Sequence, residues 1–487
     1  MSQLSTNQKL MTNWRWWLCS LLFVATTVNY LDRQVLSLTY EEFIKPEFHW
    51  TDANYGTITS FFSIFYAIAC LFAGKFVDWM GTKKGYLIAI GVWSFGACLH
   101  AFCGWGTALL VDGVESASAL KALEAGSNIA LAVSTTSVYL FLLCRGILAL
   151  GEAGNFPAAI KVTAEYFPKK DRAFATSIFN AGASVGALAA PLCIPPLAQK
   201  FGWEMAFIII GALGFIWMFF WGFMYDKPQR NKHVNAAELE YVQQDDAADA
   251  AEKAALAAEK TIPFMKCFTY KQTWSFITGK FFTDGVWWFF LFWAPSYFSN
   301  QFNAPTTSAL GQGLIFTLYA IVTVVSIFGG YLPKIFVEKR GMHPYNGRML
   351  AMLMFAFLPL CSLLAQPLGV KFDTPWWPAI LIGIAAAGHQ AWSANIFSTV
   401  GDMFPKGAIA TVTGIGAMAG GVGSMFIQKI AGNLFTYAEN AGNAFTFLGF
   451  EGKPAGYFIM FCFCGVAYLI AWCIMKSLVP KYSPVKD

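Results

Sequence analysis

The sequence places ionisable side chains within four long apolar runs, where such groups are costly and are by default candidates for function. The first run contains the pentapeptide NYLDR, in which Asn29, Asp32 and Arg33 lie at positions i, i+3 and i+4 and share one face of a helix. We favour the interpretation that Arg33 binds an anion while Asp32 binds and releases a proton. The alternative is a self-neutralised pair whose side chains reach interfacial water.

A second pair of charges is spaced differently. Arg145 and Glu152 are seven residues apart, and Asn155 continues their helix face. Structural pairs within a helix are normally three or four residues apart, whereas seven residues separate the two groups by about 10 Å along the axis. Each group therefore needs a partner on another helix, or a ligand. We interpret Glu152 as a second proton-binding carboxyl and Arg145 and Asn155 as candidate substrate contacts.

The third and fourth apolar runs also contain an unusual number of polar and ionisable residues. Lys280 and Asp284 lie at i and i+4, and Trp288 continues the same face. This pair can neutralise itself, so a binding or gating role and a purely structural role both remain open. The fourth run contains the candidate ligand-binding residues His389, Gln390, Trp392, Ser393 and Asn395. Such a stretch favours a hydroxyl-rich ligand, although a lone histidine in a helical bundle is often only a structural hydrogen-bonding group.

Together these groups indicate a small sugar-acid anion as the ligand. The cations suit a carboxylate, the amides and hydroxyls suit sugar hydroxyls, the aromatic faces suit a ring, and Asp32 and Glu152 are left to bind protons. We expect no metal and no resident cofactor. Most of the 11 cysteines lie in apolar runs, where a thiol behaves as a small hydrophobe, and none has a zinc-site spacing.

The composition shows which kind of protein must position these residues. Of 487 residues, 56% are hydrophobic and only 13% are charged, against about 25% charged in soluble domains. The mean hydropathy is +0.50. Such a chain is an integral membrane protein, which excludes nucleic-acid binding, disorder and a soluble α/β enzyme. No nucleophile triad or metal motif is present, so a membrane enzyme or sensor is disfavoured.

Twelve runs are long enough to cross a bilayer, which needs about 20 apolar residues. They are 16–37, 54–77, 85–105, 133–156, 173–196, 205–225, 274–298, 310–337, 348–366, 377–400, 409–434 and 456–478. We therefore predict an all-α membrane protein with twelve transmembrane helices in two pseudo-symmetric six-helix bundles. The predicted units are 1–225, a cytoplasmic linker over 226–272 with an amphipathic, solvated helix, and 273–487.

Basic residues predict the orientation of these spans. One set of loops and the tail hold Lys83, Lys84, Lys169, Lys170, Arg172, Lys339, Arg340, Lys406, Lys476, Lys481 and Lys486. The opposite loops hold about one Lys each. The positive-inside rule then places both termini in the cytoplasm. The longer segment 107–132 becomes an external loop.

An internal repeat supports two halves. The sequence EYFPK at 165–169 resembles DMFPK at 402–406, and each is followed by Ala-Thr and a Gly-rich run. This alignment places Gly151-Glu152 opposite Gly388-His389. Repeated halves with a site between them at the bilayer midplane are typical of transporters.

Several motifs resemble the major facilitator superfamily. GKFVDWMGTKK at 74–84 is similar to the loop between its second and third spans. NYLDR, RGILALGEAGNFP at 145–157 and FPKKDR at 167–172 resemble its anion:cation symporter branch. The segment 203–217 and Gly388-His389-Gln390 are most similar to bacterial hexuronate transporters.

The resemblance implies an alternating-access fold that imports a sugar acid with protons. It implies that Asp32 and Glu152 are the proton sites, that Arg33 binds the substrate carboxylate, and that Tyr30 and Tyr66 line the site. It also implies that Gly74, Asp78, Gly81, Lys83 and Lys84 form a conformational motif, in which Asp78 caps a helix or pairs across a helix interface in the outward-facing state.

Two positions depart from the relatives. Galactonate carriers have a Gln where this chain has Ala183, which favours another sugar acid. Some hexuronate relatives have Thr at the position of Asp32, which leaves the number of protons open.

The sequence therefore predicts a proton-coupled importer of glucuronate or galacturonate in a bacterial inner membrane. The alternative is a symporter or exchanger for another sugar acid or organic anion such as galactonate, glucarate or sialate, with Na⁺ not excluded as the coupling ion. We expect a monomer whose partners are the small anion and the lipid bilayer.

Overall fold

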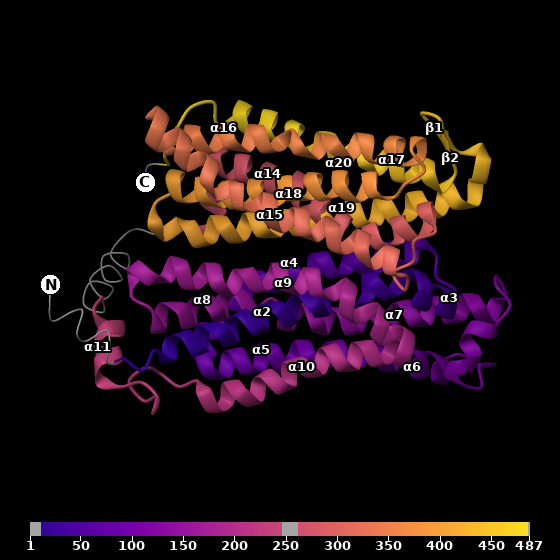
Figure 1. Cartoon of the computed structure of the whole chain (residues 1–487), viewed down its shortest axis with the longest axis horizontal. Coiled ribbons are helices and arrows are strands. Elements are labelled where there is room, and N and C mark those ends of the chain that lie inside the picture. Colours follow the sequence, from indigo (N-terminus) through magenta and orange to yellow (C-terminus); the bar gives the residue numbers. More distant parts are fainter. Residues whose placement is uncertain (1–10, 246–261, 486–487) are drawn as a thin grey trace.

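The computed structural model describes residues 11–245 and 262–485, and this part of the chain is almost entirely helical. Figure 1 shows two helical bundles lying side by side, one formed by the first part of the chain and the other by the last part. Both ends of the chain lie at the same end of the molecule, which we call the termini end. The opposite end carries a short β-hairpin and the segment 111–127, and we call it the loop end.

The first bundle contains six rods, several of them interrupted by a change of helix type. In chain order its elements are α2 (Trp14–Thr39), η1 (Tyr40–Ile44), α3 (Lys45–Phe48), α4 (Asp52–Met80), α5 (Thr82–Leu99), η2 (His100–Phe102), α6 (Cys103–Leu110), η3 (Ala117–Ala122), α7 (Asn128–Glu152), α8 (Asn155–Tyr166), α9 (Lys169–Phe201) and α10 (Trp203–Met224).

The second bundle follows the linker elements α11 (Ala236–Gln243) and α13 (Phe264–Cys267). Its elements are α14 (Lys271–Phe302), α15 (Ala309–Arg340), α16 (Pro344–Ala356), η4 (Leu358–Cys361), α17 (Ser362–Lys371), α18 (Trp376–Met403), α19 (Lys406–Ala441), η5 (Gly442–Ala444), β1 (Thr446–Phe447), β2 (Phe450–Glu451) and α20 (Lys453–Leu478). The two strands pair antiparallel.

Eight helical segments of the described residues are long and apolar enough to cross a membrane. The four other long helices, α2, α14, α18 and α19, are not among these eight, and three of them carry Arg33, Lys280 and His389. The twelve rods are consistent with the predicted twelve-helix architecture.

The two bundles are joined by polar contacts in the loop-end half of the molecule. Lys453 Nζ lies 2.7 Å from Asp52 Oδ2, and Ser296 donates a hydrogen bond to Glu41 at 2.6 Å. Nearer the middle, the hydroxyls of Ser63 and Ser424 are 3.0 Å apart. These contacts pair α4 with α19 and α20, and the extension of α2 with α14, so they hold the loop end closed.

The linker differs from the prediction of a solvated helix. Its helix α11 ends at Gln243, and Glu238 on this helix is only 1% exposed. Its carboxylate lies 3.1 Å from Arg15 Nη1 and accepts hydrogen bonds from the backbone of Trp14 and Arg15. Free N–H groups at a helix start favour a carboxylate, so α11 caps the beginning of α2. The rest of the predicted acidic helix, 246–261, lies outside the described residues.

Candidate functional site between the bundles

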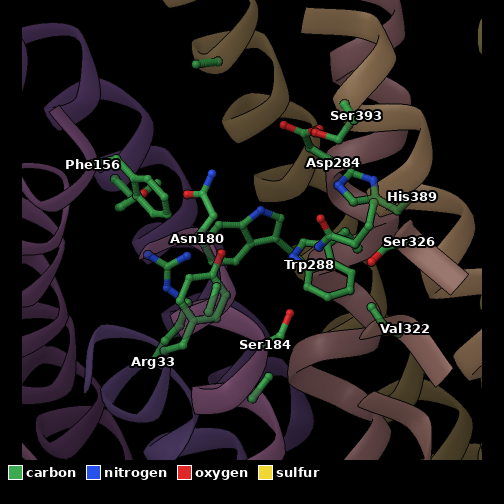
Figure 2. Close-up of a pocket in the computed structure, with 18 of the residues that line it drawn as sticks. Arg33, Phe156, Asn180, Ser184, Asp284, Trp288, Val322, Ser326, His389 and Ser393 are labelled. Atoms are coloured by element: carbon green, nitrogen blue, oxygen red, sulfur yellow. The ribbon is translucent and has the colours of Figure 1, made fainter. Parts of the chain in front are cut away.

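A cavity of about 670 Å³ lies between the two bundles, and residues of both form its walls. Figure 2 shows Arg33, Phe156 and Asn180 on one side and Asp284, His389 and Ser393 on the other. The predicted residues that line it are Tyr30, Arg33, Tyr66, Lys280, Asp284, Trp288, His389, Gln390 and Ser393. Residues more than 350 positions apart in sequence therefore meet in one space.

The wall formed by the first bundle contains a buried ion pair. Arg33 on α2 donates two hydrogen bonds to Glu152 Oε2 at the end of α7, from Nε at 3.0 Å and from Nη2 at 2.7 Å. Both side chains are buried, at 5% and 0% exposed. Glu152 thus has a partner on another helix, and this partner, Arg33, lines the cavity.

Close packing of two helices sets the position of Glu152. A Cβ at the preceding Gly151 would lie 2.3 Å from the backbone nitrogen of Trp93 and 2.6 Å from the carbonyl oxygen of Ala89. Only glycine allows α7 to approach α5 this closely. The approach buries the end of α7 in the bundle and directs Glu152 to Arg33 rather than to lipid.

Aromatic rings surround the Arg33 guanidinium. Its Cζ atom lies 4.8 Å from the ring centroid of Tyr66, 5.2 Å from that of Tyr30 and 5.1 Å from that of Trp288. Cation–π contacts at these distances are favourable when water is excluded. Because Trp288 belongs to the second bundle, Arg33 contacts both halves of the molecule.

The opposite wall contains a second ion pair, within a single helix. Lys280 Nζ lies 2.7 Å from Asp284 Oδ2 on α14, and their side chains are 6% and 15% exposed. Lys280 also lies over the Phe397 ring, 4.3 Å from its centroid. With both pairs formed, the ionised groups at the cavity wall sum to zero charge.

His389 is held in place by two neighbours. Its Nδ1 lies 2.8 Å from the Tyr468 hydroxyl, and its ring stacks on Trp287 at 5.6 Å between centroids. One ring nitrogen is therefore occupied by the protein. Gln390 and Ser393 lie on the same wall of the cavity.

Six predicted residues do not line this cavity: Asp32, Arg145, Glu152, Asn155, Trp392 and Asn395. Glu152 reaches it through Arg33. Successive residues on a helix are turned by about 100°, so Asp32 lies off the Arg33 face and Trp392 and Asn395 lie off the Gln390–Ser393 face. Direct contact of a ligand in this cavity with these groups is not supported by the geometry.

Other contacts occupy most of these six residues. Tyr86 donates a hydrogen bond to Asn155 Oδ1 at 2.8 Å, Asn395 donates to the carbonyl oxygen of Ala391, and Trp392 packs on Tyr468. Asp32 and Arg145 are 2% and 1% exposed. Neither Asp32 carboxylate oxygen has a hydrogen-bond partner among the described residues, and Arg145 lies 5.2 Å from the Phe62 ring centroid.

Four polar residues of the cavity wall were not among the residues predicted from the sequence. Asn180 and Ser184 on α9, and Thr323 and Ser326 on α15, contribute polar side chains to the cavity. The two residues of each pair are three or four positions apart, which places them on the same face of their helix. Uncharged polar residues are common in transmembrane helices, however, so this signal is weak without knowing which face is interior.

The segment 74–84 lies at the termini end of α4 and the start of α5. Lys161 on α8 donates a hydrogen bond to Asp78 at 2.7 Å, and Lys83 Nζ lies 4.0 Å from Asp226. Asp78 thus pairs across a helix interface within the first bundle. Gly81 joins the helices with φ of 80°, a conformation that favours glycine. Gly74 has open space around its Cα, and Lys84 is exposed.

The fold and a central cavity between two helical bundles define a multi-pass membrane transporter. The family model described as Major Facilitator Superfamily matches residues 22–427, and the chain belongs to this family. It is a family of transporters, not of enzymes.

Similar proteins of known name are sugar-acid transporters. The chain is 27% identical over 420 residues to a hexuronate transporter of Escherichia coli (strain K12), covering 86% of this chain and 87% of that one. It is 27% identical over 344 residues to a galacturonate transporter of Dickeya chrysanthemi, covering 71% and 88%. It is 25% identical over 420 residues to a D-galactonate transporter of Escherichia coli O6:H1, covering 85% and 87%.

Solved structures share the fold. A bacterial homologue of the human lysosomal transporter Spinster, in an inward-facing and occupied conformation, superposes with a TM-score of 0.67 at 18% identity, covering 96% of this chain and 97% of that one. A D-xylose–proton symporter superposes with a TM-score of 0.63 at 15% identity, with the same coverage.

Proposed function

We propose that this protein imports a hexuronate, glucuronate or galacturonate, together with protons across a bacterial inner membrane, with both termini in the cytoplasm. The observation that carries the proposal is the Arg33–Glu152 pair at the wall of a cavity shared by both bundles. The sugar-acid transporters to which the chain is similar support the substrate class.

The pair couples a proton to an anion. While Glu152 is ionised, it occupies two N–H groups of Arg33. A proton on Glu152 removes the negative charge and leaves the guanidinium unneutralised in a buried site, which is unfavourable. A substrate carboxylate then restores neutrality by accepting two parallel hydrogen bonds from the planar guanidinium of Arg33. Proton and substrate therefore bind in the same step of the cycle.

The cavity also suits the rest of a sugar acid. Trp288 and Tyr66 offer flat faces to a pyranose ring, and Asn180, Gln390 and Ser393 offer amide and hydroxyl groups to its hydroxyls. Ala183 lines the cavity at the position where galactonate carriers place a Gln, which favours a sugar acid other than galactonate.

Alternating access follows from opposed movements of the bundles. In this structure the contacts at the loop end, such as Asp52–Lys453, join the bundles. Breaking them and bringing the termini ends together would expose the cavity to the other side, which we assign to the outside. Asp32, buried beside the pair, is the second proton site in this scheme.

The membrane potential explains why protons are needed. Moving one elementary charge across 100 mV is worth about 2.3 kcal/mol, so a monoanion entering an inside-negative cell moves uphill. One proton cancels the charge, and a second allows the potential to drive uptake.

Uptake by the purified full-length protein in proteoliposomes tests this function. An inwardly directed proton gradient should drive accumulation of labelled glucuronate or galacturonate, an uncoupler should abolish it, and a sodium gradient at equal pH should not replace it. Accumulation that follows the sodium gradient would establish the alternative Na⁺-driven carrier. The absence of counterflow with any sugar acid would overturn the substrate class.

A further inference from the structure

We propose that the Lys280–Asp284 pair makes the cavity selective for sugar acids with a single carboxylate, uronates and aldonates, and excludes aldarates, which carry a carboxylate at each end. This inference rests on the proposed function and adds to it the charge of the accepted substrate. Asp284 is the specificity-determining residue.

The pair is fixed in a geometry that keeps Asp284 at the cavity wall. Lys280 Nζ holds Oδ2 at 2.7 Å. The same oxygen packs against the α19 backbone at Gly420, where a Cβ would lie 2.1 Å from it. The other oxygen, Oδ1, is buried and has no hydrogen-bond partner among the described residues. The carboxylate is thus held by one cation and has an unused acceptor.

The charges of the two walls then set the charge of the substrate. A proton on Glu152 gives the first wall one positive charge, on Arg33, while Lys280 and Asp284 leave the second wall neutral. One substrate carboxylate neutralises the charged groups that line the cavity, Arg33, Lys280 and Asp284, whereas Asp32 and Arg145 lie behind the wall. A second carboxylate would leave a net negative charge in a buried site, which is strongly unfavourable without a partner.

The second wall carries groups that suit the hydroxyl groups of a substrate better than a second carboxylate. Besides the Lys280–Asp284 pair, Gln390, Ser393 and Ser326 supply polar side chains that line the cavity and suit hydroxyl groups. Figure 2 shows Asp284, His389 and Ser393 on the side opposite Arg33. A substrate whose carboxylate binds Arg33 directs its other end to this wall. In a uronate that end is the anomeric hydroxyl, in an aldonate the primary alcohol, and in an aldarate a carboxylate that Asp284 repels.

Counterflow in proteoliposomes tests the selectivity. The wild-type protein, loaded with unlabelled glucuronate, takes up labelled glucuronate while external glucuronate, galacturonate, gluconate, glucarate or galactarate competes. Glucarate and galactarate should inhibit at least roughly tenfold more weakly than glucuronate, because like charges placed together across a binding site oppose association.

Asp284→Asn should remove this preference for glucuronate over the aldarates. The substitution keeps the shape but leaves Lys280 as an unpaired cation, so the two aldarates should gain at least roughly tenfold in inhibition relative to glucuronate. Asp373→Asn, the same chemical change at an exposed position after α17, is the matched control. If Asp284→Asn does not fold, Asp284→Asn combined with Lys280→Gln removes the repulsion by Asp284 but leaves the wall neutral, so the discrimination should become weaker without being reversed.

The outcomes separate this inference from the proposed function. Equal inhibition by aldarates and uronates in the wild type, or an unchanged ratio in the Asp284 variants, overturns the selectivity and leaves sugar-acid transport standing. Failure of every sugar acid to support counterflow overturns the proposed function itself.

Discussion

The two ion pairs at the cavity walls are built differently. Arg33 and Glu152 lie on two helices and are 119 residues apart, whereas Lys280 and Asp284 close one turn of a single helix. Opening the first pair releases one helix from another, but opening the second moves only a side chain. The comparison teaches that an interhelical pair can couple binding to rearrangement, while an intrahelical pair is suited to recognition.

Among the variants of the two ion pairs, Glu152→Gln should change transport the most. The amide cannot alternate between charged and neutral forms, so accumulation of substrate under a proton gradient should be lost while exchange of internal for external substrate is partly retained. Asp284→Asn should still accumulate glucuronate under the same gradient. Both are measured as the ratio of internal to external label in proteoliposomes. Normal accumulation by Glu152→Gln would make this residue structural.

Arg33→Lys should weaken substrate binding, because a point charge replaces a planar fork. Loss of one charge-assisted hydrogen bond costs about 1.5–3 kcal/mol, which corresponds to roughly 10- to 100-fold in affinity. The reciprocal change Lys280→Arg should cost less, since Lys280 contacts hydroxyls in our scheme. Competition against labelled glucuronate measures both. Unchanged affinity in Arg33→Lys would place the substrate carboxylate at Lys280 instead.

The smallest effects are expected from glycines that support the two walls. At Gly186 a Cβ would lie 2.5 Å from the carbonyl oxygen of Thr27 and 2.9 Å from Tyr30 Cβ, so Ala there must displace α2. We expect a loss of about 1–3 kcal/mol in the free energy of unfolding, measured as a lower Tm.

At Gly420 the obstacle is the end of the Asp284 side chain rather than the backbone atom met at Gly186, so less of the structure must move. Gly420→Ala should therefore lower Tm less than Gly186→Ala and should mainly change competition by aldarates. A larger loss of Tm at Gly420 than at Gly186 would show that the second wall is the more rigid one.

Much of the fold was predictable from the sequence because the bilayer imposes a simple rule. Each span needs a long apolar run, and the runs indicated an all-α membrane protein, while motifs such as NYLDR and the segment 74–84 resembled the superfamily that the family match confirms. In the linker, the acidic composition predicts a solvated, amphipathic helix, and the burial of Glu238 against Arg15 is a contact that local sequence does not encode.

The candidate site was predictable in part. The cost of charges in apolar runs identified Arg33, Glu152, Lys280 and Asp284, and three of these line the cavity while Glu152 supports it. The same rule also selected Arg145 and Asp32, which the structure places behind the wall. A charge in a span must be buried among protein groups, but that requirement does not distinguish a cavity wall from the interior of a bundle.

The sequence by itself determined the chemistry of this protein. It shows which charged residues lie within membrane-spanning runs, how many such runs there are, and which residue types are suited to bind a ligand. Only the tertiary structure decided the partners that lie on different helices. It brought Arg33 to Glu152 rather than to Asp32, because helix packing at positions such as Gly151 sets which faces meet, whereas the i, i+4 spacing of Lys280 and Asp284 already allowed their pair. Spacing along one helix fixes a face, but the rotation and approach of a neighbouring helix depend on contacts from distant parts of the chain.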